Sequence, residues 1–305
     1  MIIEKYSVFT VILTILHTSN SQNVKFNDLL NENKQIIAHT NLCPLRIVGG
    51  IETSVSNVPY QIALRQGVSG GLYWTSFCGG SLITEIFVIT AAHCFDGRNL
   101  KSVRAVAGTT KSNVNVFTML TEDWRVIKNY YRHKCYNKMA LENDIALFEV
   151  VKSFIVSSDV KPVRLHSLDM GWDILEGENC LVSGFGYLEN EKPSSVLRMV
   201  CVPIMSTKDC ALFFSSRLLH KSTFCAGIKN KDSCQGDSGG PIVCRGVLVG
   251  IVSWGGICGM QPGVYTRISN YTTGEYIPFV KRTLSLNSDN WLILMQILLI
   301  SLCYY

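Results

Sequence analysis

From residue 47 onward, the sequence consists of short apolar runs that turn-forming residues interrupt. Val, Ile, Tyr and Thr are frequent within the runs, and Gly, Asn, Ser or Pro separate them. Examples are residues 60–64, 80–83, 87–90, 103–107, 144–148, 180–183, 241–244 and 247–252. Branched and aromatic side chains in runs of this length are typical of β-strands, and many such runs in series indicate a barrel or a sandwich. We therefore expect an all-β domain.

The composition is that of a folded protein with a disulfide framework. Of the 305 residues, 47% are hydrophobic and 17% charged, which allows one large domain or two smaller ones with a substantial core. The formal net charge of +5 is spread without a long Lys/Arg block, so nucleic acid is not indicated as a partner. The twelve cysteines lie at scattered spacings without paired C-x-x-C motifs, which favours disulfides over structural zinc.

The N-terminal residues are typical of a secreted protein. Residues 1–21 contain Lys5, an apolar run and then the small residues Ser19 and Ser21, which predicts a signal peptide cleaved before Gln22. Residues 22–46 are polar and lack periodicity, so we interpret them as a pro-segment. The expected location is secreted, extracellular.

The C-terminal residues 285–305 form a short polar linker and an apolar tail. Residues 291–305 carry no charge but are slightly short for a spanning helix. The polar residues before them make too short a spacer for a usual GPI signal. Membrane attachment through 291–305 and a tail that packs on the domain both stay open.

Residues 231–241 hold a serine in a glycine-rich loop. Ser238 lies between Asp237 and two glycines, with Cys234 before it and Cys244 after it. Such a loop can present a hydroxyl group beside free backbone N–H groups, as acyl transfer requires. Alone, the motif fits an ordinary glycine turn equally well.

Two further residues could complete a nucleophilic site with Ser238. His93 follows an apolar run and suits a general base near neutral pH. Asp144 opens another apolar run and could fix the tautomer of that base. Taken singly, His93 also fits a core histidine and Asp144 a turn residue, and spacing alone does not bring the three together.

The blocks around these residues resemble the signature blocks of the chymotrypsin-like serine proteases. They are Thr-Ala-Ala-His-Cys at 90–94, Asn-Asp-Ile-Ala-Leu at 143–147 and Gly-Asp-Ser-Gly-Gly-Pro at 236–241, in the family's order. Arg-Ile-Val-Gly-Gly at 46–50 resembles the family's activation site. The resemblance covers residues 47–284 and implies a protease domain of two six-stranded antiparallel β-barrels. The active site is then expected in the cleft between the barrels, with a helix at the C-terminus.

The resemblance implies an acyl-enzyme mechanism. Ser238 is expected to attack the scissile carbonyl, His93 to transfer the proton and Asp144 to hold His93. The N–H groups of Gly236 and Ser238 are expected to form the oxyanion hole. No cofactor is implied.

The same resemblance implies cleavage after Arg or Lys. Asp232 occupies the position at the base of the family's P1 pocket, where a carboxylate favours a cationic side chain. Gly255 and Gly263 occupy the wall positions and leave the pocket open. Ser253 begins the segment that resembles the family's strand for the substrate backbone.

Activation is expected to follow a cut after Arg46. In the family, the new α-amino group, here that of Ile47, pairs with the acid before the nucleophile, here Asp237, and orders the site. Because the cut follows an arginine, the activating enzyme is expected to be another trypsin-like protease or the enzyme itself. Protein substrates and protein inhibitors are the other expected partners.

The cysteines follow the family in part. The implied disulfides are Cys78–Cys94, Cys180–Cys244, Cys210–Cys225 and Cys234–Cys258. Cys43, Cys135, Cys201 and Cys303 remain. Cys43 could join the pro-segment to Cys135 or to Cys201, and the sequence does not choose between them.

Two departures and one alternative complete the prediction. The loop at 111–119 lacks the acidic ligands with which trypsins bind calcium, so we expect no metal there. Asn270 begins a glycosylation sequon near the expected last helix, where packing could block its use.

The alternative function is a non-catalytic protease homologue that acts as a binding or regulatory module. That class typically lacks one of the catalytic residues, whereas all three are present here.

Overall fold

The fold is described from a computed structural model, which covers residues 43, 50–115, 117, 122–172, 175–188, 192–214, 219–229 and 233–272. The chain divides into two units, residues 1–42 and 43–305, and every described residue belongs to the second. The expected signal peptide and the C-terminal tail lie outside the described residues, as do Arg46, Ile47 and Asp232. Of the expected pro-segment, only Cys43 is described.

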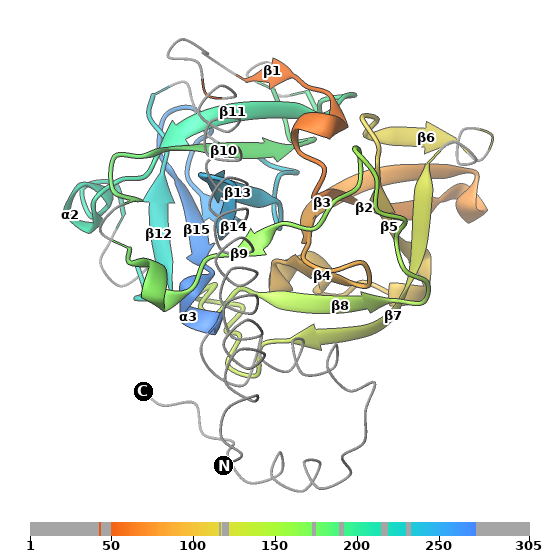
Figure 1. The fold of residues 1–305 in the computed structure, drawn as a ribbon, viewed down its shortest axis with the longest axis horizontal. Coiled ribbons are helices and arrows are strands. Elements are labelled where there is room, and N and C mark those ends of the chain that lie inside the picture. Colours follow the sequence, from red (N-terminus) through yellow and green to blue (C-terminus); the bar gives the residue numbers. More distant parts are fainter. Residues whose placement is uncertain are drawn as a thin grey trace, which may run out of the picture. The chain divides into compact units, whose positions relative to one another are not determined.

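Six strands from the first half of the domain close into an antiparallel barrel (Figure 1). In spatial order they are β2 (Gln61–Val68), β5 (Val103–Ala107), β7 (Asp123–Arg132), β8 (Ala146–Val150), β4 (Phe87–Thr90) and β3 (Tyr73–Leu82). The pairing of β3 back onto β2 closes the ring, and β6 (Asn113–Asn115) extends β3 at one edge. Closure leaves the backbone groups of these strands paired, which removes the exposed edges of an open sheet.

The second half repeats this arrangement. Its path runs through β11 (Arg198–Pro203), β10 (Asn179–Gly184), β13 (Pro241–Cys244), β14 (Val247–Gly255), β15 (Gly263–Arg267) and β12 (Thr223–Ala226). An antiparallel bridge between Ile204 and Ala226 joins the end of β11 to β12. Two short strands are added, β1 (Ile51–Glu52) on β11 and β9 (Arg164–Leu165) parallel to β14. The expected fold of two six-stranded barrels is confirmed.

The described helices are all short. They are the 3-10 turns η1 (Val55–Asn57), η2 (Ser69–Gly71), η3 (Ala92–Phe95), η4 (Leu100–Ser102) and η6 (Leu168–Met170), and the α-helical turns α2 (Thr207–Cys210) and α3 (Ser269–Thr272). At the position of the expected C-terminal helix, the structure has α3 up to Thr272, and the residues after Thr272 are not described. In the described part of the chain, no helix has the length and apolar character needed to cross a membrane.

Alternate residues of neighbouring strands meet in the core of the second barrel. Cys180 and Val182 of β10 and Val200 and Val202 of β11 belong to one buried cluster in the second barrel. Because successive side chains of a strand point to opposite faces, this spacing of two directs one face of each strand into the barrel. Leu181, on the opposite face of β10, is also buried, which agrees with the continuous apolar run in the sequence.

A buried ion pair lies in the first barrel, beside the loop that the sequence predicts to lack a metal. Arg65 is fully buried, and its Nη1 lies 2.5 Å from Oε2 of Glu122. Its Nη2 donates to Oγ1 of Thr109 at 3.0 Å and also to the carbonyl of Lys111. The guanidinium therefore joins the two ends of this loop, and the buried charge is compensated by a carboxylate and by hydrogen bonds.

Candidate active site

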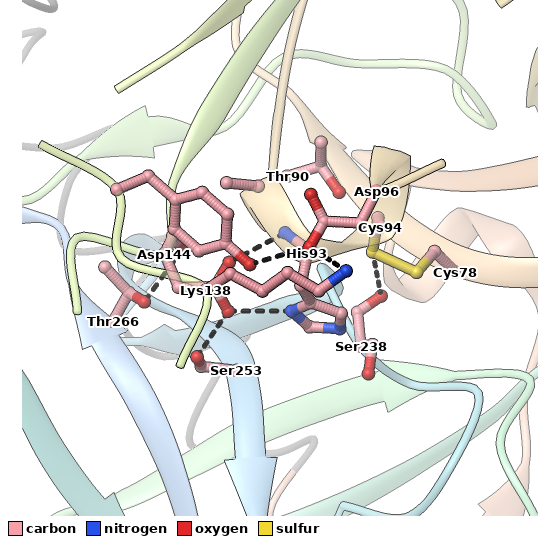
Figure 2. Close-up of polar contacts among 12 residues, drawn as sticks. Cys78, Thr90, His93, Cys94, Asp96, Lys138, Asp144, Ser238, Ser253 and Thr266 are labelled. Carbon is pink, nitrogen blue, oxygen red and sulfur yellow. Dashed lines mark hydrogen bonds and ion pairs between the residues drawn. A yellow bond between two sulfur atoms is a disulfide. The ribbon is translucent and has the colours of Figure 1, made fainter. Parts of the chain in front are cut away.

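His93 and Asp144 are brought together in the first barrel. His93 lies in η3, which follows β4, and Asp144 lies in the turn before β8. The His93 backbone N–H donates to Oδ1 of Asp144 at 2.9 Å, and Nδ1 of the ring lies 2.7 Å from Oδ2 (Figure 2). A carboxylate at Nδ1 holds the ring proton on that nitrogen, so Nε2 is left as a base.

Asp144 is fully buried and is held by the second barrel. The hydroxyl of Ser253, in β14, donates to Oδ2 at 2.5 Å, and the hydroxyl of Thr266, in β15, donates to the main-chain carbonyl at 2.9 Å. The preceding Asn143 has a φ of 52° and accepts a hydrogen bond from the Tyr271 hydroxyl at 3.0 Å. These contacts compensate the buried charge and fix its orientation.

Ser238 lies between β3 and β14, where the two barrels meet. Its carbonyl accepts from the N–H of Gly79 at 2.7 Å, and the next residue, Gly239, donates to the carbonyl of Val252 at 2.8 Å. The carbonyl oxygen of Ser238 also lies 3.6 Å from Sγ of Cys94, the neighbour of His93. Figure 2 shows Ser238 beside the His93 ring, on the side away from Asp144.

Glycine is required immediately after the serine. Gly239 has a φ of 78°, and a Cβ there would come within 2.2 Å of Oγ1 of Thr90 and 2.7 Å of the carbonyl of Gly79. The close approach of the serine loop to the histidine strand therefore depends on the missing side chain.

The turn around Ser238 leaves two backbone donors available. Gly236 has a φ of 94°, the N–H of Asp237 donates to the Cys234 carbonyl at 3.0 Å, and the N–H of Gly240 donates to the Asp237 carbonyl at 2.8 Å. Among the described residues, no acceptor is bonded to the N–H of Gly236 or to that of Ser238. Two unpaired donors beside a hydroxyl can stabilise an oxyanion.

The half-buried Asp237 points away from these donors into a cradle of backbone. Its Oδ1 accepts from the N–H of Gly186 at 2.7 Å, and its Oδ2 accepts from the N–H of Cys234 at 3.0 Å. A Cβ on Gly184 would lie 2.1 Å from Oδ1, and one on Gly186 would lie 2.3 Å from Oδ2. Burial raises the pKa of Asp237 to about 6, while the two backbone donors act in the opposite direction.

Asp237 lines a pocket of about 270 Å³ that reaches the start of the described domain. Gly50, Arg198 and Met199 line the same pocket. Nη2 of Arg198 donates to the carbonyl of Gly50 at 2.7 Å, and β1 pairs with β11 directly after Gly50. The chain that enters the domain is therefore held beside the pocket that contains the Asp237 carboxylate.

The structure describes three of the four expected substrate-binding residues. Ser253 and Gly255 lie on β14, and Gly255 pairs with Gly263 on β15. A Cβ on Gly255 would be 3.6 Å from the Cα of Gly263, which is ordinary contact, so these two glycines lie against each other. Asp232, the expected base of the P1 pocket, is among the residues that are not described.

The four disulfides that the resemblance implies are present. They are Cys78–Cys94, Cys180–Cys244, Cys210–Cys225 and Cys234–Cys258. The open question about Cys43 is resolved, because it is bonded to Cys201 on β11. Cys135 is also disulfide-bonded, and Cys303 is not described.

Several contacts of the site were not expected from the sequence. Ser253 was expected only in the substrate strand, yet its hydroxyl bonds to Asp144. Thr266 and the glycine pair Gly184 and Gly186 were not singled out at all. The spacing of that glycine pair around one phenylalanine was the available signal, since two glycines so close at a strand end indicate close backbone approach.

Comparisons with known proteins agree with the fold and with this geometry. The family model described as Trypsin matches residues 47–273. Trypsin-3 of Salmo salar is 38% identical over 233 residues, which are 74% of this chain and 90% of that protein. Trypsin of Xenopus laevis is 35% identical over 249 residues, 79% of this chain and 92% of that protein. Serine protease 1 of Homo sapiens is 33% identical over 249 residues, 80% of this chain and 91% of that protein. The chain therefore belongs to the trypsin family and is a trypsin-like serine endopeptidase.

Proposed function

We propose that this endopeptidase cleaves peptide bonds through an acyl-enzyme formed on Ser238. His93 takes the serine proton and then gives it to the leaving amine, and Asp144 holds the ring and stabilises the imidazolium. The N–H groups of Gly236 and Ser238 stabilise the tetrahedral oxyanion. The observation that carries the proposal is the hydrogen-bonded pair of His93 and the fully buried Asp144, with Ser238 beside the ring.

The proposed P1 residue is arginine or lysine, selected by Asp232. The pairing of Gly255 with Gly263 supports an open pocket wall, since neither residue carries a side chain that would fill the space. The names of the relatives, several of which are trypsins, support the same specificity. Protein substrates and protein inhibitors are the partners that the family implies.

We propose that the enzyme is secreted as a zymogen that is activated by a cut after Arg46. The new α-amino group of Ile47 then pairs with Asp237 and orders the oxyanion loop. Two observations support this: Gly50, three residues after Ile47, lines the pocket that holds the Asp237 carboxylate, and burial has raised the pKa of that carboxyl group. A trypsin-like protease is the proposed activator.

The pro-segment is proposed to stay attached after this cut. Cys43 lies before Arg46, and its disulfide with Cys201 holds it to β11. The activated enzyme is then a two-chain molecule. Electrophoresis of the cut protein tests this. The segment is expected to stay joined to the rest of the protein under non-reducing conditions and to be released under reducing conditions. Release of the segment without reduction would contradict the proposal.

The test of catalysis uses protein cut with immobilised trypsin, which is then removed, and N-terminal sequencing verifies that the new chain begins at Ile47. The cut protein is expected to hydrolyse Arg and Lys amide substrates, and Ser238→Ala is expected to lower the rate by about 10⁶-fold. Equal activity of the cut Ser238→Ala protein would refute the catalytic assignment. No hydrolysis by the cut parent protein would instead favour the non-catalytic alternative.

The test of specificity is Asp232→Ser in the same cut protein. The expected result is a selective loss of cleavage after Arg and Lys, read from a peptide library. A P1 preference that stays unchanged would contradict the role of Asp232 while leaving the catalytic proposal intact.

A further inference from the structure

A single tripeptide of the sequence, Asn270-Tyr271-Thr272, has the pattern that accepts an N-linked glycan. The asparagine is followed by a residue other than proline and then by threonine, and Asn-x-Ser/Thr occurs nowhere else in the 305 residues. From the sequence alone, packing of the last helix could block its use. The structure describes all three residues, which lie in α3 after the end of β15.

Asn270 is the exposed member of a segment that is otherwise buried. Ser269, Tyr271 and Thr272 have exposed fractions of only 1%, 5% and 8%. The Tyr271 hydroxyl donates to Oδ1 of Asn143 at 3.0 Å, and the Thr272 hydroxyl donates to the carbonyl of Ser269 at 3.1 Å. The neighbours therefore anchor α3 on the domain, while the asparagine stays on the surface, where a folded protein has room for a bulky glycan.

The side-chain amide of Asn270 contacts a turn at the surface of the second barrel. Its Nδ2 donates to the carbonyl oxygen of Lys221 at 3.2 Å. Lys221 is exposed and lies directly before β12, in a turn that the N–H of Thr223 and the carbonyl of His220 close at 3.0 Å. Because β12 pairs with β15, which precedes α3, this contact joins two neighbouring segments (Figure 1).

The hydrogen bond to Lys221 is compatible with glycosylation of the same nitrogen. An asparagine Nδ2 carries two hydrogen atoms, and attachment of a sugar replaces one of them. The other hydrogen can still be donated to the Lys221 carbonyl. The modified side chain can therefore keep its contact, and the first sugar would lie beside the turn at residues 220–223.

We propose that Asn270 carries an N-linked glycan in the secreted enzyme. The donor is an oligosaccharide joined to a lipid diphosphate. The bond from C1 of the first sugar to the diphosphate oxygen breaks, a bond from C1 to Nδ2 forms, and the lipid diphosphate leaves with the proton that Nδ2 loses. Transfer occurs on the translocated chain before the domain folds, so burial of Thr272 in the folded protein does not hinder it. The inference rests on the proposed secretion and is independent of the proposed chemistry at Ser238.

The test uses the full-length Ser238→Ala protein, in which self-cleavage is not expected, produced in cultured eukaryotic cells. A peptide-N-glycosidase hydrolyses the side-chain amide of a glycosylated asparagine and leaves an aspartate. The treated protein is expected to migrate faster in electrophoresis, in one step. When the treatment is done in heavy-oxygen water, mass spectrometry is expected to find the labelled aspartate in place of Asn270. Secreted protein in which Asn270 is unmodified overturns the proposal.

A matched pair of substitutions separates the glycan acceptor pattern from the packing of α3. Thr272→Ser keeps the pattern and is expected to retain the mobility shift. Thr272→Val keeps both Asn270 and the shape of the side chain, but it removes the hydroxyl and is expected to lose the shift. Asn270→Gln is expected to lose it as well. A shift that persists in Thr272→Val or in Asn270→Gln overturns the proposal, and site mapping of the parent protein decides the outcome even if a variant does not fold.

Two versions of the Ser238→Ala chain distinguish this proposal from the proposed secretion. One version keeps residues 1–21, and the other has a signal peptide of established function in their place. A glycan on the second version alone would contradict the predicted signal peptide and still support the site at Asn270. Absence of the glycan from the second version overturns the site.

Discussion

Two carboxylates support the candidate site, and their surroundings differ. Asp144 is fully buried and accepts from His93 and from Ser253, so its charge has side-chain partners from both barrels. Asp237 accepts from two backbone N–H groups only, those of Gly186 and Cys234, and burial raises its pKa to about 6. Among the described residues, no cation is paired with Asp237.

The difference indicates which part of the site is complete before the proposed cut. The Asp144–His93 pair is assembled in the intact chain, where both oxygens of Asp144 have partners. Among the described residues, no positive charge compensates the Asp237 carboxylate, as expected if the α-amino group of Ile47 supplies one after the cut. If the proposed activation occurs, we therefore expect it to change the surroundings of Asp237 and to leave those of Asp144 unchanged.

The largest expected effect comes from Asp144→Asn. The amide no longer fixes the proton on Nδ1 of His93, so kcat is expected to fall by about 10⁴-fold, the scale established for the triad of this family. The measurement is kcat on an arginine amide after the cut. The new N-terminus at Ile47 is expected to form normally, and a loss of kcat below tenfold would contradict the role of Asp144.

Asp237→Asn is expected to have the next largest effect, and only on the cut protein. Without the carboxylate, the ammonium group of Ile47 has no partner, so the oxyanion loop is ordered less often. A loss of about 10²–10³ in kcat/KM is expected, similar to the loss of an oxyanion donor. In the uncut protein, the same substitution is expected to leave thermal stability equal or higher, because it removes a poorly compensated buried charge. If Asp237→Asn instead destabilises the uncut protein, the Asp237 carboxylate already stabilises the fold before the cut. The proposed difference between Asp237 and Asp144 would then be wrong.

The catalytic blocks and the barrel fold could be predicted from the sequence because their signals are local. Short apolar runs predict the β-strands, and a few consecutive residues around His93, Asp144 and Ser238 identify the catalytic blocks. The boundaries were less accurate. The run at 144–148 was expected as a strand, whereas β8 is Ala146–Val150. Asp144 precedes the strand because it follows Asn143, which has a φ of 52°, and is turned toward His93.

The contacts that the sequence did not predict join residues far apart in the chain. Ser253 and Asp144 are separated by 109 residues, Thr266 and Asp144 by 122, and Arg65 and Glu122 by 57. The disulfide between Cys43 and Cys201, one of the two pairings that the sequence left open, spans 158 residues. Such pairs depend on which strands are neighbours in the closed barrels, and no local pattern specifies that.

The raised pKa of Asp237 leads to a prediction for the stability of the uncut protein. Between the ordinary pKa of 3.8 and the folded value of about 6, the folded chain binds more protons at this group than the unfolded chain. This group's contribution to the free energy of unfolding therefore decreases as the pH rises through that window, by about 1–2 kcal/mol after allowance for partial exposure.

The measurement compares uncut Ser238→Ala protein with uncut Ser238→Ala, Asp237→Asn protein in urea between about pH 3 and pH 7, which extends roughly two pH units to either side of the window's middle near pH 5. The difference between their free energies of unfolding isolates Asp237 from the other carboxylates. In the cut protein, pairing with Ile47 favours the charged form, so the pH dependence is expected to weaken or change sign. Identical pH profiles of the two uncut proteins would contradict the prediction.

The smallest expected effect tests whether the second barrel helps to hold Asp144. Ser253→Ala removes the hydroxyl that donates to Oδ2 at 2.5 Å, while the two contacts to His93 remain. Losing a hydrogen bond to a charged acceptor is worth about 1.5–3 kcal/mol at most, and the remaining contacts reduce this, so kcat is expected to fall by about tenfold. Thr266→Val is the matched control, since its hydroxyl donates to the main-chain carbonyl of Asp144 and not to the carboxylate. We expect it to affect stability with little change in kcat. If Thr266→Val lowers kcat as much as Ser253→Ala does, the second barrel supports Asp144 through packing. The hydrogen bond from Ser253 to the carboxylate would then not explain the difference between Asp144 and Asp237.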